Sequence, residues 1–508
     1  MPKGSTAPPS IDGSHSTGAH THRNALVSAV RSLFSRRPDK GRELRGFELS
    51  LLASFEAGRC PVCAELENHD DHYFFWLLTE SYQEIGMQEQ VARSLGFCPR
   101  HGRRLLKDQA YGAAATSLHR RALDDLNRRL SIAPRASGIE RGPAGDSVAI
   151  ENCPGCASRD AAAGRLVGFL AGVLNDPDHT GLYGRPGVLC HRHFSMLAPR
   201  LEARSFERVL AAHAERLGRL GSSDRDEPRG IEDSSSAPMV SVARLLVSTE
   251  HGVDSYPPVD AAPSRFEAAV DPVVELADAL SQPDKCPVCT ATERAWSGWM
   301  GWLDGRAAGG VSLSAVGDLL PTCPLHVAAT LECASASLSS LVVANVLAVS
   351  RDRTATATRF LADPRDPNID PEDLPVIVHL RTRRERFAAA VEVIGRDVPC
   401  AVCDRLRSAA DRTLQLLFAL LHQERYRVLF EQGYGLCFRH WARAEALSPP
   451  ESVARTLRRV ELAKLALLRW ESEEYLRKYA WSVRPERRGA EQAAPQDVVR
   501  RFSGTGLA

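Results

Sequence analysis

The chain has 508 residues, of which 44% are hydrophobic and 25% are charged, and its 64 Lys and Arg residues nearly balance 63 Asp and Glu residues. This composition is typical of a globular protein rather than a disordered or fibrous one, and the length predicts several compact units instead of one core. A net charge of +1 excludes a global electrostatic attraction to nucleic acid or to an anionic membrane.

The N-terminus lacks the charged start and apolar stretch of a secretory signal. The longest apolar stretches, such as Leu166 to Leu174, are shorter than the roughly 20 residues needed to cross a bilayer. We therefore expect a cytoplasmic protein without a transmembrane segment. In a reducing compartment, closely spaced cysteines indicate metal binding or redox chemistry before structural disulfides.

Twelve of the thirteen cysteines fall into four triplets, and each third cysteine is followed three residues later by a histidine. A triplet thus contains a C-x-x-C pair and a later C-x-x-H pair, with 38 residues from first to third cysteine in the first triplet and 37 in the others. The sets are Cys60, Cys63, Cys98 and His101; Cys153, Cys156, Cys190 and His193; Cys286, Cys289, Cys323 and His326; and Cys400, Cys403, Cys437 and His440. Such regular spacing indicates the duplication of one supersecondary unit.

Each set of three cysteines and one histidine predicts a zinc site. Zinc in structural sites prefers a closed tetrahedral shell of thiolate and imidazole, and ligands three residues apart can reach one ion from a tight turn. We expect the two ligand pairs of one repeat to bind the same ion. Four protein ligands leave no coordination position for water, so the sequence favours four structural zinc sites over a metal-hydroxide mechanism.

Other uses of these cysteines fit the sequence less well. A thioredoxin-like C-x-x-C pair needs a βαβ context that the sequence lacks. Attachment of a c-type haem needs a histidine directly after the second cysteine, where Ala64, Ala157, Thr290 and Asp404 stand. An iron–sulfur cluster with a histidine ligand stays open as an alternative. Cys333, outside the triplets, is expected to be a small buried apolar residue.

Apolar residues between the ligand pairs recur at helical spacing, as in Phe74 and Leu78 or Leu414, Leu417 and Leu421, and no strand-like alternation competes. The pattern predicts an all-α fold of four repeated helical modules, each with a Cys3His zinc site. The widest gap between repeats contains a polar stretch. We therefore expect two pairs of modules, the first with the second and the third with the fourth.

These boundaries predict seven segments along the chain, whose names are kept below. They are a flexible N-terminal segment at 1–40, module 1 at 41–131, module 2 at 147–220, a linker at 221–262, module 3 at 263–350, module 4 at 380–482 and a C-terminal tail at 483–508. We expect Ala25 to Arg37 to form a first helix that packs on module 1. His69 to His72 is interpreted as a solvated polar turn rather than a further metal site.

Several motifs resemble an uncharacterised bacterial family of helical CPxC and CxRH proteins. They are C-P-V-C at Cys60 to Cys63, G-F-C-P-R-H at Gly96 to His101, G-L-C-F-R-H at Gly435 to His440, and Tyr475 to Tyr479. The resemblance implies a zinc-binding helical fold and no particular activity. Module 3 departs most from the motifs, because Leu325 replaces the arginine and no glycine precedes its C-x-x-H pair.

The sequence contains no P-loop, dinucleotide-binding, nucleophile-elbow or H-E-x-x-H motif. We therefore predict a non-enzymatic scaffold or adaptor that binds protein partners. Two alternatives stay open. One is a nucleic-acid-binding regulator that uses the basic C-terminal region, including Arg477, Lys478, Arg487 and Arg488. The other is a redox or iron–sulfur sensor or electron-transfer protein.

Overall fold

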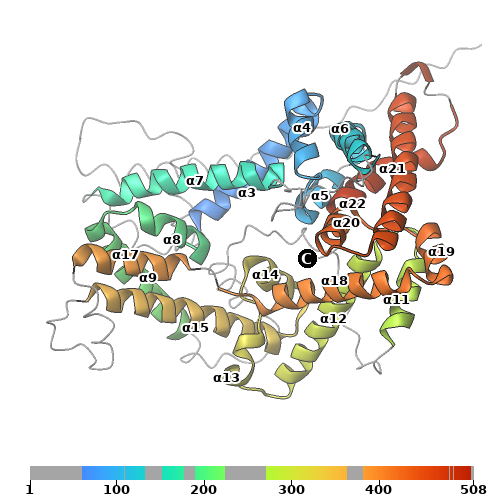
Figure 1. Cartoon of the computed structure of the whole chain (residues 1–508). Helices are drawn as coiled ribbons and strands as arrows, with labels where there is room; N and C mark the ends of the chain where they lie inside the picture. The colour runs from blue at the N-terminus through green and yellow to red at the C-terminus, as the bar shows by residue number, and fades with distance from the viewer. Residues whose placement is uncertain are drawn as a thin grey trace, which may run out of the picture.

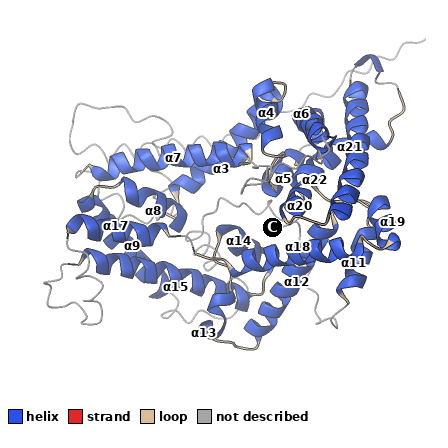
Figure 2. Cartoon of the chain, viewed as in Figure 1, coloured by secondary structure: helices blue, strands red, loops and turns tan. Residues whose placement is uncertain are grey.

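The computed structural model describes residues 60–107, 109–131, 152–176, 189–222, 271–362, 382–396, 398–479, 481–483 and 486–504. Within these ranges the regular structure is helical and no strand occurs (Figure 2), which confirms the predicted all-α class. The predicted N-terminal segment 1–40, the helix expected at Ala25 to Arg37 and the linker beyond residue 222 lie outside the described residues.

The four modules share one order of helices. A helix begins at the C-x-x-C pair, a shorter helix begins at the C-x-x-H pair, and a long helix follows. In chain order these are α3 (Pro61–Trp76), α5 (Pro99–Leu106) and α6 (Gly112–Ser131); α7 (Pro154–Asn175), α8 (His191–Leu197) and α9 (Ala203–Ser222); α12 (Pro287–Ala308), α14 (Pro324–Cys333) and α15 (Ala336–Leu361); and α18 (Ala401–Leu420), α20 (Phe438–Ala446) and α21 (Glu451–Tyr479).

Further elements precede, connect or follow these helices. They are η1 (Leu77–Ser81), α4 (Ile85–Arg93), η2 (Gln109–Tyr111), η4 (Ala198–Arg200), α11 (Pro272–Ser281), α13 (Leu313–Val316), η6 (Gly317–Leu319), α17 (Arg383–Gly395), α19 (Glu424–Gln432), η7 (Trp481–Val483), η8 (Ala490–Ala493) and α22 (Ala494–Ser503). Of the described helices, none combines the length and the apolar character that a membrane span requires.

Both kinds of ligand pair lie at helix N-termini, because the first cysteine of each pair is the N-cap residue of the helix that follows. In five of these eight helices the next residue is proline: Pro61, Pro99, Pro154, Pro287 and Pro324. Proline suits the first helical position, since its φ is already helical and its missing N–H would have no partner there. The prolines in the motifs thus fix where the helices start.

The modules form the two predicted pairs. Modules 1 and 2 pack through α3 and α7, and modules 3 and 4 pack through α12 and α18 (Figure 1). The pairs also contact each other at two ends. At one end α6 of module 1 packs on α21 of module 4, and at the other α9 of module 2 packs on α15 of module 3 and α8 packs on α17. The same kind of long helix is therefore used at both contacts between the pairs.

The buried clusters lie across module boundaries rather than inside modules. One combines modules 1 and 4 with the beginning of module 3 and includes Phe97 and Phe438. A second combines module 2 with the start of α3 and with residues of α15 and α17, and there Phe206 packs edge-on against Phe387. A third, around Trp296, combines module 3 with the start of α18. Each cluster contains residues of more than one module, so the stability of each module depends in part on its neighbours.

The C-terminal tail contributes α22, which packs on α5, α6, α20 and α21 and so joins modules 1 and 4. Its Phe502 is fully buried, with its ring centroid 4.7 Å from that of Phe438 and 5.2 Å from that of His119. A Cβ on Gly96 would lie 2.5 Å from the Cβ of Phe502, and Gly96 has a φ of +80°. Glycine at this position therefore allows both the turn and the close approach of α22.

Candidate metal centres

Four groups of three cysteines and one histidine occur in the described part of the chain, and the ligand atoms of each group lie within 4.8 Å of one another. They contain all sixteen predicted ligands. Site 1 is Cys60, Cys63, Cys190 and His193; site 2 is Cys98, His101, Cys153 and Cys156; site 3 is Cys286, Cys289, Cys437 and His440; and site 4 is Cys323, His326, Cys400 and Cys403. Each group could hold one metal ion.

The combination of ligand pairs differs from the prediction. We expected one repeat to supply all four ligands of a site, but every site combines the C-x-x-C pair of one module with the C-x-x-H pair of its partner module. Module 1 supplies its C-x-x-C pair to site 1 and its C-x-x-H pair to site 2, and module 2 supplies the complementary pairs. Modules 3 and 4 exchange ligand pairs in the same way at sites 3 and 4.

Helix length gives a physical reason for this exchange. The helix α7 begins at the C-x-x-C pair of module 2 and has 22 residues, which corresponds to a length of roughly 33 Å. The chain is therefore carried away from this pair before it reaches the C-x-x-H pair of the same module. Because α7 packs along α3, the distant end of each module meets the complementary pair of the other.

The sulfur positions fit a single tetrahedral ion. In each site, one sulfur from the C-x-x-C pair lies close to the sulfur of the C-x-x-H pair. The distances are 3.7 Å for Cys63 and Cys190, 3.7 Å for Cys98 and Cys156, 3.8 Å for Cys289 and Cys437, and 3.7 Å for Cys323 and Cys403. Zinc–thiolate bonds of ~2.3 Å in a tetrahedron place two sulfurs roughly 3.8 Å apart.

The histidines present Nδ1 to the sulfurs in all four sites. Nδ1 lies 3.4 Å from the sulfur three residues earlier in His101 and 3.2 Å from it in His193, His326 and His440. The other ring nitrogen, Nε2, is buried in His101 and His326 and meets no hydrogen-bond acceptor among the described residues. Nδ1 would therefore be the metal-binding nitrogen, and the proton would remain on Nε2.

Aromatic rings hold two of these imidazoles in place. The ring centroid of Phe74 lies 5.4 Å from that of His101, and the ring centroid of Trp296 lies 5.6 Å from that of His326. Metal-bound histidines usually donate their second N–H to an oxygen. In sites 2 and 4, ring packing takes over that orienting role.

The thiols attract positive charge into the sites. Burial disfavours protonated His101, but hydrogen bonds that its ring N–H donates to the sulfurs of Cys153 and Cys98 raise the pKa of the imidazole to about 9. Burial also disfavours protonated His440, but the charges of Cys289 and Cys286 outweigh burial and raise the pKa of its imidazole to about 10. A divalent cation bound among the sulfurs would supply the positive charge that otherwise has to come from a proton.

The helix N-termini also favour loaded sites. Three thiolates and one divalent ion carry a net charge of about −1. Every site lies at the N-termini of two helices, where backbone N–H groups without intrahelical partners carry partial positive charge. The helix ends therefore stabilise the thiolates that a metal ion requires.

The arginine of the CxRH motif has a structural partner in modules 1 and 2. Arg100 lies 3.2 Å from the carboxylate of Asp70, which is only 3% exposed and also pairs with the buried Arg159 of α7. Arg192 pairs with Asp160 at 2.7 Å. The prediction that His69 to His72 is a solvated turn is therefore wrong, because these residues lie within α3 and Asp70 is buried in the contact between modules 1 and 2.

A second buried ion pair supports site 3 and was not predicted. Glu461 of α21 is fully buried, pairs with Arg501 of α22, and accepts a hydrogen bond of 2.8 Å from the backbone N–H of Leu436. Arg501 also donates to the backbone oxygen of Tyr434. These contacts fix the turn that leads into Cys437. No local pattern indicates them, because the two charged residues are 40 positions apart in sequence.

Site 2 contains a glycine where the other C-x-x-C pairs contain valine. A Cβ on Gly155 would lie 2.7 Å from Nδ1 of His101. The valines at this position, Val62, Val288 and Val402, are no more than 1% exposed. The smaller residue thus leaves room for the imidazole of site 2.

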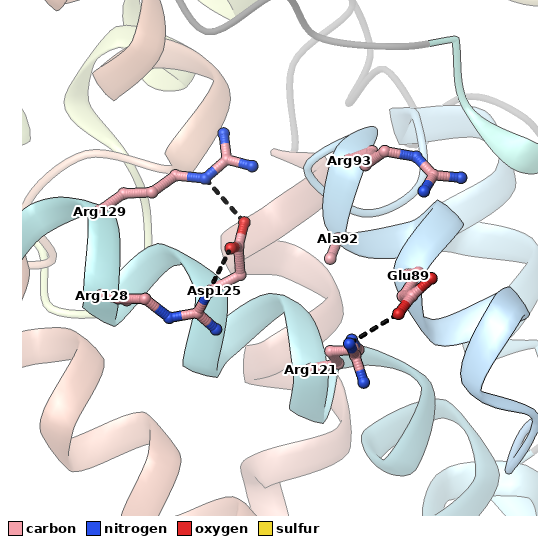
Figure 3. Close-up of a pocket in the computed structure, with 7 residues that line it drawn as sticks. All are labelled: Glu89, Ala92, Arg93, Arg121, Asp125, Arg128 and Arg129. Atoms are coloured by element: carbon pink, nitrogen blue, oxygen red, sulfur yellow. Dashed lines mark hydrogen bonds and ion pairs between the residues drawn. The ribbon is translucent and has the colours of Figure 1, made fainter.

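One cavity of about 150 Å³ lies between α4 and α6, and none of its lining residues is a predicted metal ligand. Figure 3 shows Arg121 directed at Glu89, and Arg128 and Arg129 directed at Asp125; the ion pairs measure 2.6, 3.7 and 2.7 Å. The lining residues are Glu89, Ala92, Arg93, Arg121, Asp125, Arg128 and Arg129. Because its carboxylates are paired with arginines, this cavity offers ion pairs rather than a general base.

The fold and the sites define an all-α repeat protein with four Cys3His groups, each of which could hold a metal ion. Residues 272–456 match the model of a family of unknown function, DUF6062. This part runs from α11 into α21 and contains every ligand of sites 3 and 4. The match agrees with the resemblance to an uncharacterised family, whose bacterial origin stays a prediction. No curated protein and no solved structure matches the chain.

Proposed function

We propose that this chain is a non-enzymatic helical scaffold, held together by four structural zinc ions, that binds protein partners. The observation that carries the proposal is the exchange of ligand pairs, because an ion in each site would tie two modules together. Structural zinc contributes ~10–16 kcal/mol in small finger peptides, so such ties are strong enough to set the arrangement of modules.

The donor set supports a structural role for the metal. Three thiolates and one imidazole fill a tetrahedral shell and leave no position for water or substrate. The short distances also favour one ion over an iron–sulfur cluster, because a cluster spreads its protein ligands over several irons. Thirteen cysteines without a disulfide agree with the cytoplasmic, reducing location that we propose.

Exposed apolar side chains support binding to other proteins. Trp470 and Leu467 of α21 are 57% and 53% exposed and lie three residues apart, so they share one face of the helix. Phe75 and Trp76 at the end of α3 are 59% and 39% exposed. Large apolar and aromatic side chains at a surface are typical of protein interfaces.

The nucleic-acid alternative receives less support. Arg477 pairs with Glu474 and Glu486, and Lys478 pairs with Glu474 and Glu491. Two cations of the predicted basic region thus already have acidic partners, which reduces their attraction for phosphate.

Elemental analysis of the purified full chain, with its visible absorption spectrum, tests the metal assignment. We expect about four zinc ions per chain, no colour, and a loss of cooperative unfolding after zinc is chelated. Iron with visible absorption would refute the proposal.

The partner-binding part needs a separate experiment. Leu467→Ser with Trp470→Ser should abolish co-purification of a partner while the zinc content and the melting temperature stay unchanged. The other exposed apolar surface is tested in the same way with Phe75→Ser and Trp76→Ser. If neither pair of substitutions changes the set of co-purifying proteins, these two surfaces do not bind the partner.

A further inference from the structure

The four sites differ in exposure, and the difference follows the pairing of modules. In site 1 no cysteine is more than 4% exposed, and in site 3 none is more than 2% exposed. In sites 2 and 4, by contrast, two of the three cysteines are half-buried. Each module pair therefore contains one closed site and one open site.

The open sites are equivalent positions of the two module pairs. Site 2 combines the C-x-x-H pair of module 1 with the C-x-x-C pair of module 2, and site 4 combines the C-x-x-H pair of module 3 with the C-x-x-C pair of module 4. The half-buried residues are also equivalent: Cys98 and Cys323 begin the C-x-x-H pairs, and Cys156 and Cys403 end the C-x-x-C pairs. The same exposure at two independent positions indicates a property of the architecture.

The closed sites are covered by the fold. At site 3, the end of α22 lies over the sulfurs, since a Cβ on Gly504 would lie 3.4 Å from Sγ of Cys437 and 3.5 Å from Sγ of Cys289. At site 1, Cys60 and Cys63 of module 1 lie in the second buried cluster, among apolar residues of module 2. A reagent reaches these sulfurs only after a local opening of the structure.

In each open site the two half-buried cysteines are neighbours. The sulfurs of Cys98 and Cys156 are 3.7 Å apart, and those of Cys323 and Cys403 are also 3.7 Å apart. A disulfide requires an S–S distance of ~2.05 Å. Both pairs reach this distance if the sulfurs move by less than about 2 Å. Each disulfide would join two modules, as the metal does.

We propose that sites 2 and 4 are peroxide-oxidisable sites, at which Cys98–Cys156 and Cys323–Cys403 disulfides form and zinc is released while sites 1 and 3 keep theirs. This inference rests on the proposed zinc scaffold and adds a redox response to it. Accessible thiolates are the ones that peroxides oxidise, and the four half-buried cysteines are the metal-site thiols that meet this condition.

The chemistry balances with a hydroperoxide as the oxidant. One thiolate attacks the peroxide, the O–O bond breaks, and a sulfenic acid and hydroxide form. The second thiolate attacks the sulfenic sulfur, the S–S bond forms, and a second hydroxide leaves. Two thiolates lose two electrons in total, and hydrogen peroxide with two protons becomes two water molecules. Zinc, left with one cysteine and one histidine, passes to solvent or to a chelator.

Because the disulfide joins the same modules as the lost ion, oxidation is expected to loosen the open site without separating the modules. The freed ligands at site 2 are His101 and Cys153, and those at site 4 are His326 and Cys400. Zinc release and a local change in structure are therefore the expected outputs, rather than unfolding.

The test uses the full zinc-loaded chain with Cys333→Ser, which removes the one cysteine outside the sites. Serine can keep the hydrogen bond that Sγ of Cys333 makes to the backbone oxygen of Ala329. The chain is treated with hydrogen peroxide beside a zinc-binding dye, free thiols are blocked, and disulfides are mapped by mass spectrometry. We expect two of the four zinc ions to be released and both predicted cross-links to form. Sites 1 and 3 should react at least about tenfold more slowly than sites 2 and 4.

Release of all four ions at one rate, earlier release from sites 1 and 3, or no release would overturn the inference. So would disulfides within a C-x-x-C pair in place of the predicted cross-links. The zinc content before peroxide separates this result from the scaffold proposal. A chain that holds four zinc ions but oxidises without site preference contradicts only the redox inference, whereas a chain isolated without zinc contradicts the scaffold.

The untreated chain supplies a second measurement that needs no substituted ligand. Without oxidant, an alkylating reagent should label Cys98, Cys156, Cys323 and Cys403 before the cysteines of sites 1 and 3. The wild-type chain tested beside the variant shows whether Cys333 competes. Burial raises the pKa of Cys333 to about 11, so it should contribute little thiolate. Equal labelling of all twelve ligand cysteines would contradict the assignment of open and closed sites.

Discussion

The exchange of ligand pairs can be tested by two double substitutions that remove the same number of ligands. Cys60→Ala with Cys190→Ala removes two ligands of one site that come from different modules. Cys60→Ala with Cys98→Ala removes two ligands of one module that belong to different sites. If sites combine modules as in the structure, the first variant loses one ion and the second loses two.

The zinc content therefore distinguishes the arrangements by a whole ion. The structure predicts about three zinc ions per chain for Cys60→Ala with Cys190→Ala, and about two for Cys60→Ala with Cys98→Ala. If each repeat filled its own site, these two values would be reversed. Loss of a structural ion is expected to reduce the free energy of unfolding by several kcal/mol, within the ~10–16 kcal/mol that binding contributes in finger peptides.

The free energies should also be non-additive in a specific way. After Cys60→Ala has emptied site 1, Cys190 no longer binds a metal, so Cys190→Ala should cost only about 1 kcal/mol more. Cys98→Ala in the same background empties site 2 and should cost as much as it does alone. The single variants complete both cycles.

The assay is elemental analysis after gel filtration in the presence of a weak chelator, followed by denaturant unfolding of each variant. Cys286→Ala with Cys437→Ala, and Cys286→Ala with Cys323→Ala, repeat the comparison in modules 3 and 4. Two zinc ions left in Cys60→Ala with Cys190→Ala and three left in Cys60→Ala with Cys98→Ala would refute the exchange. Equal zinc content in both variants would show that the sites are not filled independently of one another.

Three further predictions concern packing and charge. Gly155→Ala should weaken zinc binding at site 2, because its Cβ would meet the imidazole there. Gly164→Ala on the same helix has open space and should stabilise the protein by up to about 1 kcal/mol. The two variants are compared by site-resolved zinc loss and by melting temperature. Arg501→Met should cost about 3–5 kcal/mol by leaving Glu461 buried without its partner, and adding Glu461→Leu should recover part of this in denaturant titrations. Burial lowers the pKa of the His119 imidazole to about 4, whereas in the unfolded chain histidine has a pKa of about 6.5. Below pH 6.5 the unfolded chain therefore binds a proton that the folded chain does not, and the free energy of unfolding should fall by about 2 kcal/mol from pH 7 to pH 5. His119→Phe should remove this contribution to the pH dependence.

The ligands and the fold class could be predicted because both follow from local spacing. Cysteines three residues apart can share an ion whatever surrounds them, and apolar residues such as Leu414 and Leu417 mark a helix face directly. The pairing of modules was also accessible, since a long polar linker separates the second repeat from the third.

The combination of half-sites could not be predicted from spacing. Each repeat carries one C-x-x-C and one C-x-x-H pair, so ligands from the same repeat and ligands from two repeats give the same Cys3His composition. The choice depends on how α3 packs along α7, which involves contacts such as the ion pair between Asp70 and Arg159 that join positions distant in sequence. The partnership of Glu461 and Arg501 was inaccessible for a similar reason, since it forms only when α22 returns to module 4.

Exchange of ligand pairs makes the module pair, not the single module, the smallest unit in which every ligand is used. A lone module would present two half-sites with unpaired thiols, and its part of each buried cluster would lose the residues that other modules contribute. The match of residues 272–456 to DUF6062 covers most of one such pair and both of its sites. Four repeats therefore form two module pairs, which α6, α9, α15 and α21 join at both ends and which α22 also connects at one of them.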